Sequence, residues 1–230
     1  MYKKIGLLLI LISCSTIKNK NIIKKFDNGK IKTSYFLNSN EKVDGIKKEY
    51  NIDGFLEFEY LFKNGLLEGE SLQYIKKNDT IKKVVWLYRN DSILKQTQYS
   101  INNKKRVTFN YKNNKLNGEA VSYLSSGEKE RTLIYDNNNI VSEKVYFKNG
   151  KTHIIFNYVN SVPEGISTEY FITGEKRYKY LYSNGKLNGY SKEYDIDGNL
   201  IFEWHYKDNK IKGVSKEYFP NGKLKQLHLY

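Results

Sequence analysis

The sequence has very few residues that can form disulfides or bind metal ions. Among 230 residues there is one cysteine, Cys14, and there are three histidines, His153, His205 and His228. A lone cysteine excludes an intramolecular disulfide and a thiolate metal cluster, so packing has to stabilise the fold. The histidines show no His-x-x-x-His spacing, and we expect them to be incidental strand positions. The sequence therefore predicts no metal site and no cofactor.

The motifs of common enzyme classes are also missing. No Gly-x-Gly-x-x-Gly opens a helix, there is no Walker lysine, and there is no Gly-x-Ser-x-Gly elbow. Glutamates do recur before a tyrosine, but they hold one position in successive copies of a repeat, where we expect neighbouring lysines to pair with them across strands. Catalysis needs one preorganised, asymmetric locus. The sequence therefore predicts a protein without catalytic residues. The recurring glutamates are Glu49, Glu169, Glu193 and Glu217.

The sequence has no apolar run long enough to span a membrane. Its longest apolar run is short and lies near the N-terminus. It extends from Ile5 to Ile12 and follows Lys3 and Lys4. A spanning helix needs ~20 apolar residues, so this run is too short to cross a membrane. A basic start, a short apolar run and a small residue are typical of a secretory signal peptide. We therefore expect residues 1–13 to be a signal peptide and the chain to be exported.

The residues at the end of this run resemble a lipobox. Leu11-Ile12-Ser13-Cys14 is similar to the cleavage site of bacterial lipoproteins. The resemblance implies cleavage before Cys14 and acylation of its sulfur, usually with a further N-acyl chain, which together give stable anchoring. Because Ser15 and not aspartate follows, it also implies outer-membrane sorting. The alternative is an ordinary signal peptide with a chance cysteine. Residues 14–25 show no strong period and are predicted to form a lipidated tether.

The chain is strongly basic, with a formal net charge of +14. In an exported protein this balance favours anionic lipid, an acidic glycan or an acidic protein as partner, and it argues against nucleic acid. The alternative is that the lysines only keep sheet faces and edges soluble. Charge alone leaves both interpretations open.

A repeat extends from residue 26 to residue 230, in about eight units of about 24 residues. Clear copies begin at Phe62-Lys-Asn-Gly-Leu-Leu-Glu-Gly69 and Tyr182-Ser-Asn-Gly-Lys-Leu-Asn-Gly189. A tyrosine and a second Asp/Asn-Gly pair follow in most copies. Asn-Gly and Asp-Gly between alternating apolar runs favour tight hairpins with positive φ at the turn. Each unit is therefore predicted to be one β-hairpin with its connection, and the longer connection near residues 76–80 is predicted to protrude.

Apolar and aromatic residues alternate with period two in each predicted strand. In the copy near the C-terminus Leu200, Phe202, Trp204 and Tyr206 share one face. Stacked hairpins would align the equivalent rings into columns, which form a candidate binding face. Its predicted residues are Phe58, Tyr60, Trp86, Tyr88, Phe109, Tyr111, Phe156, Tyr158, Tyr180, Tyr182, Trp204 and Tyr206.

The recurring Tyr-x-Asn-Gly-Lys-Leu-x-Gly unit resembles the MORN-repeat variant of bacterial proteins, a group that includes YwqK-type antitoxins. Lys95 and Ser142 replace the last glycine in two copies, and Pro163 interrupts one connection. The resemblance implies consecutive antiparallel hairpins in an elongated, single-layer, all-β sheet. Such a layer leaves both faces open unless curling or a partner covers them.

Three functions are compatible with these patterns. The leading prediction is a lipid-anchored protein of the cell envelope that presents the sheet as a non-enzymatic binding or scaffold surface, with protein as the expected partner. The family resemblance suggests an antitoxin or immunity protein that neutralises a toxin. Aromatic platforms beside lysines also favour a binder of envelope glycans.

Overall fold

The computed structural model describes residues 19–77 and 80–230, and these residues form strands and turns without any helix. No helix of the described part is therefore long and apolar enough to span a membrane. The strand segments are β1 (Lys20–Lys25), β2 (Ile31–Leu37), β3 (Gly45–Tyr50), β4 (Leu56–Lys63), β5 (Leu66–Leu67), β6 (Gly69–Lys77), β7 (Thr80–Arg89), β8 (Ser92–Tyr99), β9 (Lys105–Lys112), β10 (Lys115–Tyr123), β11 (Lys129–Asp136), β12 (Asn139–Tyr146), β13 (Thr152–Val159), β14 (Val162–Pro163), β15 (Gly165–Tyr170), β16 (Lys176–Ser183), β17 (Lys186–Leu187), β18 (Gly189–Tyr194), β19 (Leu200–Lys207), β20 (Lys210–Ile211), β21 (Val214–Tyr218) and β22 (Leu224–Leu229).

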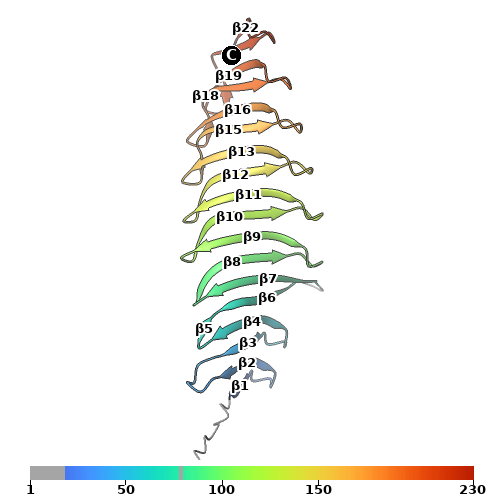
Figure 1. The fold of residues 1–230 in the computed structure, drawn as a ribbon, viewed down its shortest axis with the longest axis vertical. Helices are drawn as coiled ribbons and strands as arrows, with labels where there is room; N and C mark the ends of the chain where they lie inside the picture. Colours follow the sequence, from blue (N-terminus) through green and yellow to red (C-terminus); the bar gives the residue numbers. More distant parts are fainter. Residues whose placement is uncertain (1–18, 78–79) are drawn as a thin grey trace, which may run out of the picture.

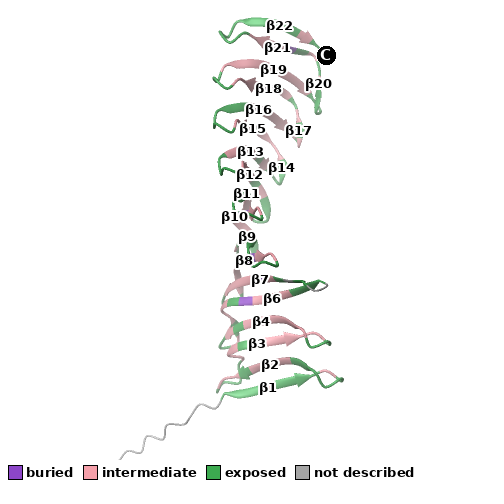
Figure 2. Cartoon of the chain, turned by 90° about the vertical axis from the view of Figure 1, so that its right-hand side faces the viewer, coloured by how far each residue is buried: buried purple, intermediate pink, exposed green. Residues whose placement is uncertain are grey.

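The strands form one antiparallel meander in a single layer. Each strand pairs with the strand before it and the strand after it in the sequence, from β1 at one end to β22 at the other (Figure 1). The two-residue segments β5, β14, β17 and β20 are each one or two residues from the next strand and share its pairing partner. The sheet twists along its length (Figure 2), because each strand has an intrinsic right-handed twist. The predicted elongated, all-β hairpin sheet is confirmed.

The sheet begins earlier than we expected. Residues 20–25 belong to the segment predicted as a tether, but they form β1 and pair with β2 through Ile22–Tyr35 and Lys24–Thr33. The turn at Asn28-Gly29 needs a strand on each side, and the β-branched Ile22 and Ile23 supply one. The predicted tether is therefore shorter by the length of β1. The predicted signal peptide and Cys14 lie outside the described residues.

The two kinds of turn lie on opposite long edges of the sheet and differ in geometry. At the first turn of every unit after the β2–β3 connection both residues have positive φ, as at Asn184 (50°) and Gly185 (78°), which is the tight primed turn we predicted. At most second turns glycine alone is left-handed, as at Gly54 (φ 87°), and Asn103 takes its place in one. The Gly54 N–H donates to the Asn51 carbonyl. The second turn is thus a three-residue loop closed by a glycine bulge, and the expectation of a primed turn there was wrong.

The connection after β6 keeps the ladder intact. β6 and β7 pair without a break from Gly69–Tyr88 to Lys77–Thr80, so the extra residues of this unit lengthen the hairpin. Residues 78 and 79 lie outside the described part.

A bulge explains the glycine that ends the first half of most units. Gly69 and Gly189 have φ of 89° and 91°, and a Cβ on either would lie 2.9 Å from Cδ2 of Leu61 or Leu181. Both positive φ and lack of space therefore favour glycine. In one unit Ser142 replaces this glycine. Ser142 pairs with Ile134, and the register shift of that strand pair lies between Ile134 and Tyr135.

Side chains of the first turns join each hairpin to the one before it. The Asn209 N–H donates to the Leu187 carbonyl, and the Leu187 N–H donates to Oδ1 of Asn209 at 2.7 Å. The same pair of bonds links Leu67 to Asp91 and Leu116 to Asn138. These bonds satisfy backbone groups at the edge of a sheet that has no second layer.

One unit lacks both halves of the side-chain bond. Pro163 holds the position of Leu187 but has no N–H, and Gly185 holds the position of Asn209 but has no side-chain acceptor. The backbone bond from the Gly185 N–H to the Pro163 carbonyl remains at 2.9 Å. The two exceptions therefore compensate each other.

A double-mutant cycle of Pro163→Leu and Gly185→Asn tests this compensation. We expect the double variant to be more stable than the sum of the single changes by about 0.5–1.5 kcal/mol, the net worth of one hydrogen bond. The asparagine Cβ would lie 3.2 Å from Val162 Cγ1, so Gly185→Asn alone should destabilise. The measurement is the free energy of unfolding in urea. A coupling of zero would show that the pairing of the two exceptions is accidental.

Candidate binding surface

The predicted aromatic residues all lie on one face of the sheet, here called the aromatic face. Cross-strand partners share a face, and the pairs Phe58–Gln73, Ser71–Trp86, Gln96–Trp86 and Gln96–Phe109 carry the face from strand to strand. The pairs Ser167–Tyr180 and Ser191–Trp204 continue it to β19. The alignment of the rings is therefore as predicted, whereas their role in binding stays a prediction.

The rings of this face pack against each other. Phe58 and Tyr60 stack with centroids 5.4 Å apart, Tyr178 and Tyr180 do the same at 5.4 Å, and Phe202 and Trp204 stack at 4.5 Å. All are half-buried. Because each pair lies on one strand, this stacking lets a single layer cover its own apolar surface.

A row of buried serines runs between the aromatic strands. Ser71, Ser167, Ser191 and Ser215 are 0–2% exposed. The backbone N–H of Leu61, Leu181 and His205 donates to Oγ of Ser71, Ser191 and Ser215, at 3.1–3.2 Å. The glycine bulge removes the ladder partner of this N–H, so the serine hydroxyl replaces it. We did not predict this row, although the recurring Ser-x-Glu-Tyr of the sequence carried its signal.

The recurring glutamates form a second row beside the serines, and aromatic donors bind them. Glu193 accepts hydrogen bonds from the Tyr178 hydroxyl at 2.7 Å and from Trp204 Nε1 at 3.1 Å. The Tyr180 hydroxyl donates to Glu169 at 2.9 Å. The expectation of lysine partners was thus incomplete. Cross-strand basic partners do occur, since Lys225 contacts Glu217 and Arg177 contacts Glu169 at 3.4 Å. On the opposite face Glu203 contacts Lys192 and Lys216 at 3.3 and 3.5 Å.

Glu143 departs from the repeat. It lies where other units have a buried serine, facing Phe156 and Leu133, and it is 8% exposed. The Tyr158 hydroxyl donates to it at 2.7 Å, and Arg131 Nε lies 3.0 Å away. Its charge is therefore compensated on the aromatic face itself.

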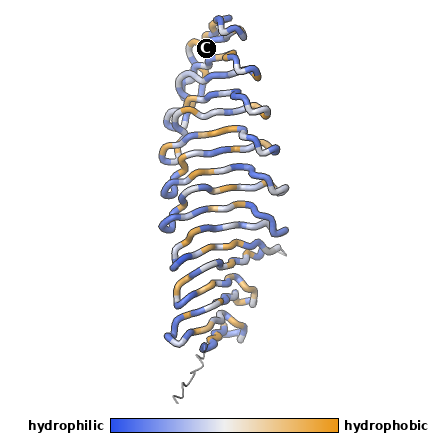
Figure 3. The backbone as a smooth tube through the Cα atoms, in the orientation of Figure 1, coloured by the Kyte–Doolittle hydropathy of each residue, from blue (hydrophilic) through white to orange (hydrophobic). Residues whose placement is uncertain are grey.

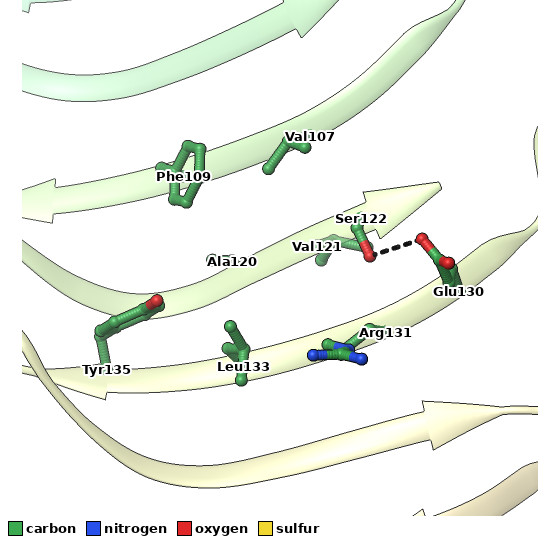
Figure 4. Close-up of a pocket in the computed structure, with 9 residues that line it drawn as sticks. All are labelled: Val107, Phe109, Ala120, Val121, Ser122, Glu130, Arg131, Leu133 and Tyr135. Carbon is green, nitrogen blue, oxygen red and sulfur yellow. Dashed lines mark hydrogen bonds between the residues drawn. The ribbon is translucent and has the colours of Figure 1, made fainter. Parts of the chain in front are cut away.

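A hollow lies in the middle of the aromatic face, beside this group. Small Ala120 forms part of its floor, and its volume is about 320 Å³. Ser122 donates to Glu130 at 3.3 Å across one side (Figure 4). The lining residues are Val107, Phe109, Ala120, Val121, Ser122, Glu130, Arg131, Leu133 and Tyr135. Arg131 already has a partner in Glu143, so the hollow offers mainly apolar contacts.

The C-terminal half of the sheet separates charge between its faces. From β12 to β22 the cross-strand register places Glu143, Glu169, Glu193 and Glu217 on the aromatic face. Lys144, Lys179, Lys192 and Lys216 lie on the opposite face, here called the lysine face. In this half these lysines lie on the lysine face together with Glu203, while Arg177 and Lys225 contact the glutamates of the aromatic face.

Apolar side chains remain accessible on both faces. Only Val84, Ala120 and Val121 are buried apolar residues among those described, and apolar and polar residues alternate along successive strands (Figure 3). Few residues are buried anywhere (Figure 2). The described strands thus enclose almost no apolar core.

The histidines are separated in the fold. His153 packs on Phe147, with centroids 4.3 Å apart, and His205 packs on Tyr190 at 4.7 Å, while His228 contacts Glu217 at 3.0 Å. Within residues 19–77 and 80–230 no group of three or more histidine, cysteine or acidic side chains is arranged to hold a metal ion.

Comparison with known proteins adds little. No family model matches the chain, and no curated protein matches it. Among solved structures the chain is similar to a porin-like protein from Bacteroides uniformis, with 9% sequence identity, 84% of this chain and 90% of that chain covered, and a TM-score of 0.22. A likeness of that size carries no argument, so the MORN resemblance stays a prediction.

The tyrosines of the aromatic face should make the fold sensitive to alkali. Burial, and then the Glu193 hydrogen bond, raises the pKa of Tyr178 to about 12; burial, and then Glu49 and Tyr88, raises the pKa of Tyr60 to about 12. A raised pKa means that the folded chain holds the proton more tightly. The resulting stability is complete below the unfolded pKa of ~10 and is lost as the pH rises through ~12.

We therefore expect cooperative unfolding between pH ~10 and ~12, with tyrosinate absorbance and circular dichroism changing together. Tyr178→Phe should make unfolding less steep in this range, because one linked proton is removed. If all 21 tyrosines ionised near pH ~10 while the sheet spectrum persisted, the burial and carboxylate contacts described above would be contradicted.

Proposed function

We propose that the chain is a lipid-anchored repeat protein of the cell envelope that binds another protein through the aromatic face and catalyses no reaction. The observation that carries this proposal is a row of half-buried rings on a layer over which no described segment packs (Figure 2). Tyrosine and tryptophan beside hydrogen-bonding groups are enriched at protein interfaces. An open, repetitive surface suits an extended partner better than a small substrate.

The charge distribution supports a protein over an anionic surface as the partner of this face. Beyond β12 its paired positions hold glutamates, and the basic residues at the bulges, Arg177 and Lys225, are already engaged by Glu169 and Glu217. An anionic lipid or glycan would meet Glu193 there, which forms no ion pair among the described residues, whereas it would meet lysines on the opposite face. The antitoxin hypothesis is one case of protein binding, in which the partner is a toxin.

Site-specific photocrosslinking tests which face binds. A photoreactive amino acid at Tyr180 points from the aromatic face, and the matched control at neighbouring Lys179 points from the lysine face. In intact envelopes we expect a discrete protein adduct from position 180 and none from position 179. The readout is a shifted band identified by mass spectrometry. Equal adducts from both positions, or from 179 alone, would contradict the assignment of the face.

The anchor is tested separately. Metabolic labelling with a palmitate analogue should label the wild-type chain and leave Cys14→Ala unlabelled, because the proposed acceptor sulfur is gone. Cys14→Ala should also leave the membrane fraction. Lipid label retained on Cys14→Ala would rule out this anchor without bearing on the binding face.

A further inference from the structure

Glu193 differs from the other recurring glutamates in its partners. Glu169 pairs with Arg177 at 3.4 Å, Glu217 pairs with Lys225, and Glu49 pairs with Lys47 at 2.6 Å. Among the described residues Glu193 forms no ion pair; it accepts only the two aromatic hydrogen bonds.

A single position explains the difference from Glu169 and Glu217. Arg177 and Lys225 each occupy the bulge beside the second turn. Each is the unpaired residue that immediately precedes the cross-strand partner of the glutamate. In the unit of Glu193 this position is Ile201. Isoleucine carries no charge, so Glu193 lacks the cationic partner that Glu169 and Glu217 have.

Glu193 lines a cavity of about 270 Å³ whose other lining residues come from β16, β18, β19 and β20. The lining residues are Tyr178, Tyr180, Ser191, Glu193, Trp204, Tyr206 and Ile211. Arg177 already lies over the Tyr178 ring at 5.1 Å, and no described lysine or arginine lies over Tyr180 or Trp204. An ionised carboxylate offers about four acceptor positions, of which the aromatic donors use two.

We propose that this Glu193 cavity receives an arginine or lysine side chain of the bound protein. Aromatic faces attract a cation through their quadrupole, and the carboxylate supplies a charge-assisted hydrogen bond. The chain already contains such an arrangement on the same face, where Arg131 and the Tyr158 hydroxyl both bind Glu143 at 3.0 and 2.7 Å. The inference rests on the proposed function, since it names the side chain by which a protein partner is recognised.

The two tryptophans of the chain provide a reporter and its control. Trp204 donates its indole N–H to Glu193, so a cation at the carboxylate should move its indole resonance. Trp86 lies on the same face opposite Ser71 and Gln96, with no glutamate across from it. The chemical shift of the Trp86 indole should therefore not change.

The experiment titrates the full chain, labelled at the tryptophan indoles, with two capped tripeptides. One is acetyl-Gly-Arg-Gly-amide, and the other carries neutral, isosteric citrulline in place of arginine. We expect a saturable shift of Trp204 with the arginine peptide, and at least tenfold weaker binding of the citrulline peptide. Glu193→Gln should weaken arginine binding about tenfold, whereas Glu169→Gln, the control, should change it less than about twofold.

A second variant keeps the test decisive if Glu193→Gln fails to fold. Ile201→Arg places a basic residue where neighbouring units have Arg177 and Lys225, so the variant should fold. Its guanidinium should pair with the Glu193 carboxylate. Arginine peptide binding should then fall about tenfold. An unresponsive Trp204, an equal response to citrulline, or full binding by Ile201→Arg would each overturn the proposal. If Trp204 stayed silent while position 180 still crosslinked a protein, the binding face would stand and this recognition element alone would fail.

Discussion

The structure depends on the antiparallel backbone ladder of a sheet with no second layer. Each strand obtains its hydrogen bonds and its side-chain cover only from its two neighbours. Only Val84, Ala120 and Val121 are buried apolar residues in the described part, so no core contributes much of the stability. Every unit therefore has to satisfy its neighbour, and this is why the same residues recur at the same positions.

The repeated polar residues follow from that requirement. The glycine bulge breaks the ladder, and a buried serine hydroxyl accepts the N–H that is left over. Glutamates bind tyrosine hydroxyls and an indole N–H, which satisfies polar groups under half-buried rings. Turn side chains join the hairpins along one edge. A surface built in this way is regular, and its exceptions are Glu143, which takes the place of a buried serine, and Glu193, which forms no ion pair among the described residues.

Much of this architecture could be predicted from the sequence. Turn dipeptides and period-two alternation predicted hairpins, and the constant phase predicted that Phe58, Trp86 and Trp204 share a face. The glycine bulge at the second turn and the acceptance of the Leu61 N–H by Ser71 could not be predicted, because both depend on register after a bulge. The strand at residues 20–25 was missed because its apolar residues are too few to show a period. The missing cation of Glu193 was hidden because Ile201 becomes its neighbour only across the ladder.

Deleting one whole repeat tests the dependence on neighbours most directly. Removal of residues 165–188 joins Glu164 to Gly189, the residue equivalent to Gly165, so every strand regains a matching neighbour. Removal of half a repeat, residues 165–176, places an aromatic strand where a serine-bearing strand belongs. We predict that the first variant keeps the sheet spectrum and a cooperative unfolding transition and that the second loses both. Loss of the sheet in the first variant, or its retention in the second, would contradict the account.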